Sequence, residues 1–222
     1  ILSAVNVALQ NNNAKQNSNN TISLENGSIS IESTHQQVNL DNVSLTSELI
    51  NGSRDLKFEY IKDSSVDSQS VIILLNHNTA NGITNVDIIF KNINMTQFMA
   101  GINSKSYENF YDGNLSGRLN LNFNKLGRII DSTLDLNIGA GSFEVDLPYS
   151  KQDIHNIEDA YFSVSYISSE EQVDINEIQI KHDDFSVNTK GVIQLNYDGS
   201  GKISTFDANL SGLSLFKNGQ QI

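Results

Sequence analysis

The sequence predicts an all-β protein, built as one elongated and curved antiparallel sheet, a groove-like meander with one or two short helices. Apolar and polar residues alternate along most of the chain of 222 residues, which places apolar side chains on one face of each strand. Dipeptides of the Asn-Gly and Asp-Gly type interrupt the alternation, and turn signals of all kinds recur at intervals of roughly 8 to 14 residues. Because such dipeptides favour tight turns, the two signals together indicate consecutive hairpins.

The alternation is clearest in the second half of the chain, at residues 119–123, 134–138, 143–147, 162–166 and 185–188. In the first half it is fainter, at residues 22–24, 28–31, 38–45, 56–61 and 86–90. These stretches have the length of strands in globular proteins, and they predict a meander of about a dozen strands.

The expected turns share a residue pair that readily adopts positive φ. They are Asn26-Gly27, Asn51-Gly52, Asn81-Gly82, Asp112-Gly113, Asp198-Gly199 and Asn218-Gly219. Strands joined in this way are antiparallel neighbours in a sheet.

Three segments depart from the strand pattern. Residues 94–101 place Met95, Phe98 and Met99 at helical spacing, and residues 150–157 begin with Ser and carry Asp three positions later, as a capped helical turn does. Each of these two segments predicts a short helix. Residues 11–20 are polar and low in complexity, which predicts a mobile loop.

The organisation along the chain suggests two sections of one continuous architecture. Residues 1–92 form a first β-meander that includes the polar loop, and residues 93–222 form a second, groove-like section. We expect the segment to be excised from a longer chain. No run approaches the roughly 18 apolar residues that a membrane span requires, so any membrane anchor is expected outside it.

A sheet with one apolar face must cover that face, and the alternation alone leaves three arrangements open. They are a sandwich, a barrel and a single sheet bent into a trough. Because the sequence offers few helices and almost no second set of apolar elements, it favours the trough.

Charge excludes some partners. The formal net charge is −12 and the nearest approach to a basic cluster is Lys125 with Arg128, so nucleic acid is not an expected partner. The same charge disfavours general electrostatic adhesion to anionic membranes, but it leaves room for apolar contact with lipid tails. The absence of cysteine excludes disulfides and thiolate metal sites.

No catalytic, metal or cofactor site is expected, and the chain is not predicted to be an enzyme. The four histidines are scattered, and the only one beside acids, His182, resembles a solvated hairpin end. The segment from Asp198 to Gly201 lacks both the acidic ladder of a calcium loop and the Lys-Ser/Thr ending of a phosphate loop. No Gly-x-Ser-x-Gly elbow is present, and neighbouring carboxylates such as Glu170 and Glu171 point to opposite faces of a strand.

From Ile93 onward, the order of pieces resembles the AsmA-like family of bacterial envelope proteins, especially its YhdP-type and TamB-type members. A strand runs into a short amphipathic helix at residues 93–99, and a strand with Leu115-Ser116-Gly117 follows. Further on come a glycine-bounded strand entry at residues 139–143 and a strand-Gly-strand unit at residues 185–193. Residues 21–92 look like a weaker earlier copy of this pattern.

The resemblance implies a periplasmic protein attached to the inner membrane through a segment not present here. It also implies a groove that carries phospholipid or another acyl-chain lipid and serves outer-membrane lipid balance. Two other classes remain open: a structural or adhesive β-sandwich or β-solenoid of a surface protein, and a carbohydrate-binding module. The absence of Trp and the aromatic content of 8% weigh against the carbohydrate-binding module.

The apolar positions of the alternating strands are the candidate lipid-lining residues, with ordinary core packing as the competing interpretation. They are Leu119, Leu121, Phe123, Leu134, Leu136, Ile138, Phe143, Val145, Phe162, Val164, Tyr166, Ile178, Ile180, Phe185 and Val187.

Overall fold

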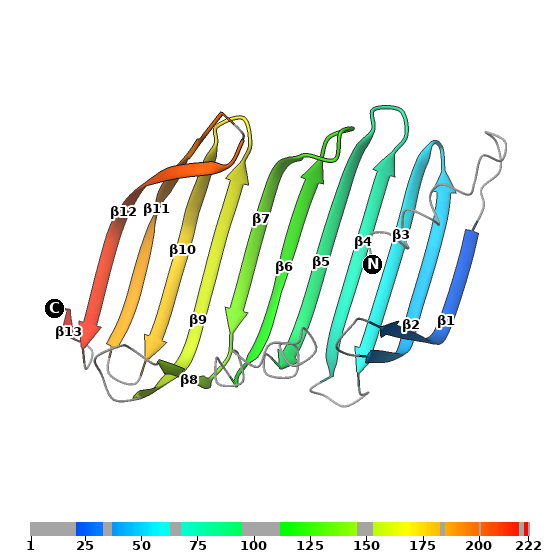
Figure 1. Ribbon diagram of the computed structural model, residues 1–222. Helices are drawn as coiled ribbons and strands as arrows, with labels where there is room; N and C mark the ends of the chain where they lie inside the picture. The colour runs from blue at the N-terminus through cyan, green and yellow to red at the C-terminus, as the bar shows by residue number, and fades with distance from the viewer. Residues whose placement is uncertain are drawn as a thin grey trace.

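The computed structural model shows an all-β protein whose strands form a single antiparallel sheet, as the alternation predicts (Figure 1). It describes residues 21–32, 37–62, 68–94, 112–145, 153–182, 185–199, 201–217 and 220–221. The loop expected at residues 11–20 and the helix expected beyond Asn94 lie outside the described residues.

Within the described residues the sheet has thirteen strands. They are β1 (Thr21–Glu32), β2 (Gln37–Ile50), β3 (Ser53–Lys62), β4 (Gln69–Asn78), β5 (Ile83–Asn94), β6 (Asn114–Phe123), β7 (Ile129–Ile138), β8 (Gly141–Val145), β9 (Asp153–Ile167), β10 (Gln172–His182), β11 (Phe185–Tyr197), β12 (Ile203–Lys217) and β13 (Gln220–Gln221).

Strand order follows chain order, which defines a meander. Each strand pairs with the one before it, except β8, which pairs with β9; β9 pairs with both β7 and β8. The sheet is not closed, because β1 and β13 stand at its two opposite edges (Figure 1).

Tight hairpins gather at one end of the sheet, called the turn end here and drawn uppermost in Figure 1. Asn51 and Gly52 have φ of 49° and 80°, so they form the two-residue turn that pairs Ile50 with Ser53. Adjacent hairpins are linked by backbone hydrogen bonds, from Thr79 N to Gly52 O (3.0 Å) and from Ser168 N to Ile130 O (2.8 Å). These hydrogen bonds keep neighbouring turns at the same position along the strand direction.

The prediction of a turn at Asn26-Gly27 is wrong. Asn26 has a φ of 53°, but both residues lie inside β1, where the register with β2 shifts on either side of Gly27. The positive φ therefore serves a β-bulge. A bulge and a tight hairpin use the same residue chemistry, so the dipeptide alone does not distinguish them.

Other bulges interrupt the sheet within its long strands. The register shifts between Phe90 and Ile93 in β5, where Asn92 has a φ of 52°, and between Ile175 and Ile178 in β10. A bulge bends its strand and increases local twist. These irregularities give a broad sheet the curvature that regular pairing would not supply.

The helix predicted at residues 150–157 is wrong from Asp153 onward. Residues Asp153 to Ile157 begin β9 and pair with Val145 to Gly141 of β8. Their backbone groups thus bond to a neighbouring strand, which offers partners along the whole segment. A single capping signature did not outweigh this pairing.

Gly117 is required by a close approach between strands. A Cβ added at this position would lie 2.3 Å from the carbonyl oxygen of Asp135 and 2.9 Å from Cζ of Phe90. Phe90 is the cross-strand partner of Gly117. The glycine therefore leaves room for both the neighbouring backbone and the aromatic ring.

We predict that Gly117→Ala destabilises the protein by about 1 to 3 kcal/mol, because a backbone oxygen cannot move aside as a flexible side chain can. Urea denaturation measures the change. Gly199→Ala is the matched control, since nothing lies within 4 Å of its added Cβ. Equal stability of the two variants would contradict the close approach.

Candidate functional site

The register of the sheet aligns apolar side chains on one face. Partner residues in adjacent strands share a face, so a ladder of pairs can be followed across the sheet. The central row contains Leu45, Phe58, Ile73, Ile88, Leu119, Leu134, Val164 and Ile175.

Parallel rows flank the central one, two residues away along each strand. Toward the turn end lie Leu56, Leu75, Val86, Leu121, Tyr166, Val173 and Ile193. Toward the opposite end lie Val43, Tyr60, Val71, Phe90, Leu136, Phe162 and Ile178, and beyond them Leu115, Ile138, Ala160, Ile180 and Val187. These rows together are called the apolar face.

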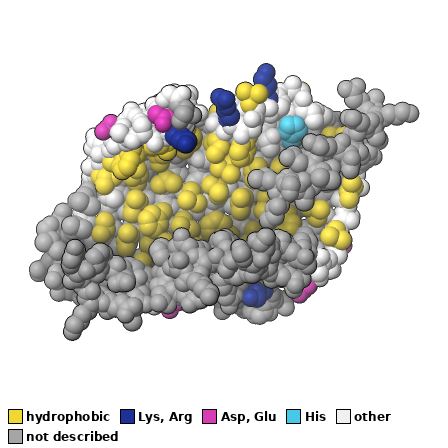
Figure 2. All heavy atoms as spheres, viewed as in Figure 1, with side chains coloured by type: hydrophobic (Ala, Val, Ile, Leu, Met, Phe, Trp, Pro, Cys, Tyr) yellow, Lys and Arg dark blue, Asp and Glu magenta, His cyan; other side chains and the backbone are white. Residues whose placement is uncertain are grey.

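The described residues leave the apolar face largely uncovered. Among the described residues, only four hydrophobic side chains are buried, Val43, Leu56, Ala160 and Ile175, and no second layer packs on the sheet. A sandwich would bury whole rows in its interior. Figure 2 shows hydrophobic side chains spread over this face from one side of the sheet to the other.

The face stays open at both edge strands. At the β1 edge, Ile22 is 59% exposed and Leu24 is 44% exposed. At the β12 edge, Phe206 is 65% exposed and Leu210 is 51% exposed. From β2 to β12 the face extends roughly 40 Å, at about 4.8 Å per strand.

The structure brings most of the predicted lining residues together on this one face. The described side chains that share it are Leu119, Leu121, Phe123, Leu134, Leu136, Ile138, Phe162, Val164, Tyr166, Ile178, Ile180 and Val187. The side chains of Phe143, Val145 and Phe185 lie outside the described part of the chain, although their backbones belong to β8 and β11. Contact with lipid remains a prediction for all of them.

Sequence reasoning missed the contribution of β2 to β5 to the face. In β4 the run Val71-Ile72-Ile73-Leu74-Leu75 hides the alternation, because Ile72 and Leu74 are apolar on the opposite face. The turn at Asn51-Gly52 was the usable signal. A two-residue hairpin fixes the register, and counting outward from it pairs Leu45 with Phe58.

Polar groups border the apolar face at the turn end. The hydroxyl oxygens of Tyr166 and Tyr197 are 3.3 Å apart, and this hydrogen bond, with partial burial, raises the pKa of Tyr197 to about 12. Nδ1 of His77 lies 2.8 Å from the hydroxyl oxygen of Thr84. The rim therefore offers hydrogen-bonding groups that the apolar rows lack.

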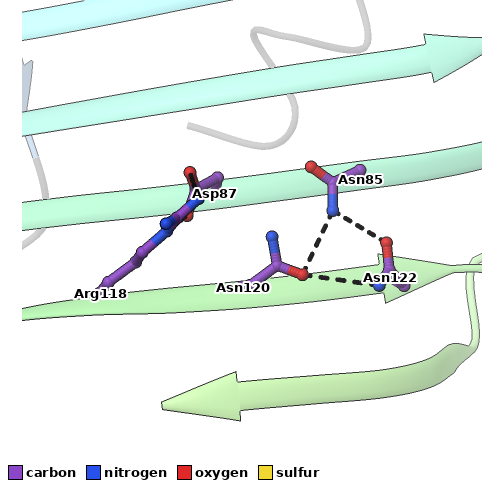
Figure 3. Close-up of polar contacts among 5 residues, drawn as sticks. All are labelled: Asn85, Asp87, Arg118, Asn120 and Asn122. Atoms are coloured by element: carbon purple, nitrogen blue, oxygen red, sulfur yellow. Dashed lines mark hydrogen bonds and ion pairs between the residues drawn. The ribbon is translucent and has the colours of Figure 1, made fainter. Parts of the chain in front are cut away.

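The opposite face of the sheet is polar and internally hydrogen-bonded (Figure 3). Asp87 is only 5% exposed, and its two oxygens accept hydrogen bonds from Nε (2.7 Å) and an Nη (2.8 Å) of Arg118. The hydrogen bond and the charge of the carboxylate raise the pKa of Arg118 above its ordinary value. The pair joins β5 to β6 on the face away from the apolar rows.

Side-chain amides continue this network along the same strands. Asn85 Nδ2 donates to Oδ1 of Asn122 (2.8 Å) and of Asn120 (3.3 Å), as Figure 3 shows, and Asn122 Nδ2 donates to Asp131 (2.6 Å). On β7, Asp135 accepts a hydrogen bond from Ser163 Oγ (2.7 Å). Ladders of this kind stabilise strand pairing on a solvated face.

We predict that Arg118→Gln lowers the urea midpoint of unfolding more than Lys57→Gln does. Asp87 would be left in a nearly buried position without its cation, whereas Glu59, the partner of Lys57, is 27% exposed and can be solvated. Adding Asp87→Asn to the Arg118 variant should restore part of the loss. Equal midpoints for the two single variants would show that the Asp87–Arg118 pair stabilises the protein no more than an exposed ion pair does.

The described residues contain no cluster of three or more His, Cys, Asp or Glu that could hold a metal ion. They also contain no helix of sufficient length and hydropathy to cross a bilayer. Comparison with protein-family models, with curated proteins and with solved structures found no match to the chain.

Proposed function

We propose that the chain is a segment of a lipid-carrying groove and that its apolar face covers the acyl chains of phospholipids. One observation carries the proposal: rows of mainly apolar side chains cross the sheet from β2 to β10, and no layer of the described residues covers them. Contiguous exposed apolar surface of this kind marks interaction or ligand sites in soluble proteins.

The dimensions of the face fit acyl chains. One chain spans about 15 Å, half of the roughly 30 Å hydrocarbon core of a bilayer. The apolar face, at roughly 40 Å across the strands, is longer than one such chain. Lipid can therefore occupy more than one position along it.

An open face supports reversible binding. Complete removal of a 16-carbon chain from water contributes about 12 kcal/mol, at roughly 0.8 kcal/mol per methylene. A sheet covers one side of the chain, so we take about half of this, near 6 kcal/mol, before the cost of immobilising the lipid. Weak binding with fast exchange suits a protein that passes lipid along rather than storing it.

The resemblance of residues 93–222 to AsmA-like proteins supports the same function and adds a cellular setting. On that basis, the proposal includes a periplasmic location, an inner-membrane anchor in another part of the protein and a role in outer-membrane lipid balance. The polar opposite face suits an aqueous compartment, because it presents polar side chains that hydrogen-bond to each other.

The two other classes have weaker support. A closed adhesive sandwich needs a second sheet, which the described residues do not form. A carbohydrate-binding face needs exposed aromatic rings, and Phe206 is the one exposed aromatic residue among the described large hydrophobic side chains.

We predict that the protein binds a fluorescent fatty-acid probe and that phospholipid displaces it. Burial of the probe beside the apolar rows should raise its emission, since its surroundings become less polar. Titration with the probe, followed by competition with phosphatidylglycerol, measures both steps. A probe whose emission stays at the level of buffer would contradict the groove.

We predict different effects for aspartate substitutions at two paired positions of β9 and β10. The substitution at Val164 should mainly weaken probe binding, and the one at Ile175 should mainly lower stability. Val164 is half-buried, so Val164→Asp can hydrate its carboxylate, costing about 1 to 2 kcal/mol while sharply weakening probe binding. Ile175 is 7% exposed, so Ile175→Asp should cost about 4 kcal/mol or more.

Chemical denaturation and probe titration of both variants test this pair. Comparable, large losses of stability at both positions would indicate a closed core at Val164. A Val164→Asp variant that is folded and binds the probe like the parent would place the acyl chain elsewhere.

A further inference from the structure

Exposed aliphatic side chains gather at the turn end of the sheet. Leu126, in the turn between β6 and β7, is 71% exposed, the highest value among the described large hydrophobic residues. Ile129 and Ile130, directly after that turn, are 39% and 37% exposed. Residues 124–130 are called the β6–β7 tip here.

Hydrogen bonds to Asn124 hold the tip in one conformation. Oδ1 of Asn124 accepts from the backbone N of Leu126 (2.9 Å) and of Arg128 (3.1 Å), and its backbone oxygen accepts from Gly127 N (2.9 Å). The polar groups of the turn are thus satisfied internally. The Leu126 side chain is left facing outward without a cost in backbone hydrogen bonding.

The neighbouring hairpin supports the tip. Gly82, in the turn between β4 and β5, approaches Lys125 so closely that an added Cβ would lie 2.7 Å from Cβ of Lys125. Ile83 and Ile50, at the ends of the adjacent hairpins, are each 40% exposed. The exposed aliphatic surface therefore extends beyond one turn.

Two cations flank the exposed leucine, Lys125 before it and Arg128 after it, and both are exposed. Asp131 follows the tip and accepts a hydrogen bond from Nδ2 of Asn122 (2.6 Å). The turn that carries Glu170 and Glu171 is the next hairpin across the sheet, joined to the tip by the hydrogen bond from Ser168 N to Ile130 O (2.8 Å). At physiological salt the Debye length is about 8 Å, so acidic residues farther across the sheet are largely screened at the tip. Residues 124–130 themselves carry two cations and no acidic residue.

The tip also connects to the apolar face. Phe123 pairs with Ile129, and the preceding residue of the same face on β6, Leu121, belongs to a row of the apolar face. The pairing therefore places Ile129 of the tip, after a register shift, beside the end of the apolar face at Phe123.

We infer that the β6–β7 tip docks on an anionic lipid bilayer, with Leu126, Ile129 and Ile130 among the acyl chains and Lys125 and Arg128 against the phosphates. Aliphatic side chains beside cations are the combination that interfacial membrane binding uses. A stable protein partner would need roughly 800 Å² on each side, more than three aliphatic side chains provide. The inference goes beyond the groove, since it rests on the tip and not on lipid binding by the sheet.

Vesicle flotation tests the inference with the protein as it exists. The protein should float with vesicles of phosphatidylcholine and phosphatidylglycerol in equal parts, and much less with phosphatidylcholine alone. Leu126→Ser and the double variant Lys125→Gln/Arg128→Gln should each lower the bound fraction at least about fivefold. Added salt should lower the vesicle-bound fraction of the parent protein more than that of the double variant.

Two controls match these changes away from the tip. Leu74→Ser removes a leucine that is 37% exposed on the polar face, and Lys91→Gln/Lys190→Gln removes two exposed cations. Both controls should float like the parent. A parent that does not float, or controls that lose as much as the tip variants, would overturn the inference.

Two further readouts separate this inference from other outcomes. Size-exclusion chromatography that shows a dimer lost in Leu126→Ser would assign the tip to contact between two copies of the chain and overturn membrane docking. Fatty-acid probe binding should be unchanged in Leu126→Ser. If the parent floats but binds no probe, the groove proposal is wrong and docking by the tip is supported. If the parent binds the probe but does not float, docking by the tip is wrong and the groove is supported.

Discussion

The structure depends on one constraint, the antiparallel register that carries apolar positions across the sheet on the same face. A shift of one residue in any hairpin would move that strand's apolar set to the other side. Tight turns such as Asn51-Gly52 prevent this by fixing each pairing at its origin. Where bulges add a residue, as at Asn92 and beside Ile175, alignment resumes on the same face, so Leu115 and Ile178 remain in the apolar rows.

The two faces reach stability in different ways. On the polar face, Asp87 with Arg118 and the amides around Asn122 link neighbouring strands through side-chain hydrogen bonds. On the apolar face, contacts between adjacent rows bury only part of each side chain, and among the described residues few become fully buried. Surface therefore remains for a ligand, and the sheet does not need that ligand to satisfy its backbone, whose groups are paired along the strands. This separation makes lipid binding compatible with a folded empty state.

The sequence predicted the all-β meander and most of the second-half rows, because Leu119 to Phe123 and Leu134 to Ile138 alternate without interruption. It could not predict the role of β4, since apolar Ile72 and Leu74 on the opposite face erase the period. It also misplaced Asn26-Gly27, because bulges and hairpins select the same positive-φ residues. The short helix expected at residues 150–157 is wrong from Asp153 onward for a different reason. The pairing partner, β8, is a tertiary feature that a local capping pattern does not encode.

The exposed state of the apolar face is the central claim, and the most direct measurement is native mass spectrometry of protein purified without detergent. An open face that binds acyl chains weakly should retain a fraction of molecules with the added mass of phospholipid, and activation in the gas phase should release it. The groove account predicts these adducts for the parent and their loss in Val164→Asp. The folded parent protein should also be measured after incubation with an excess of phospholipid. A spectrum that shows only the mass of the chain without lipid would contradict the groove.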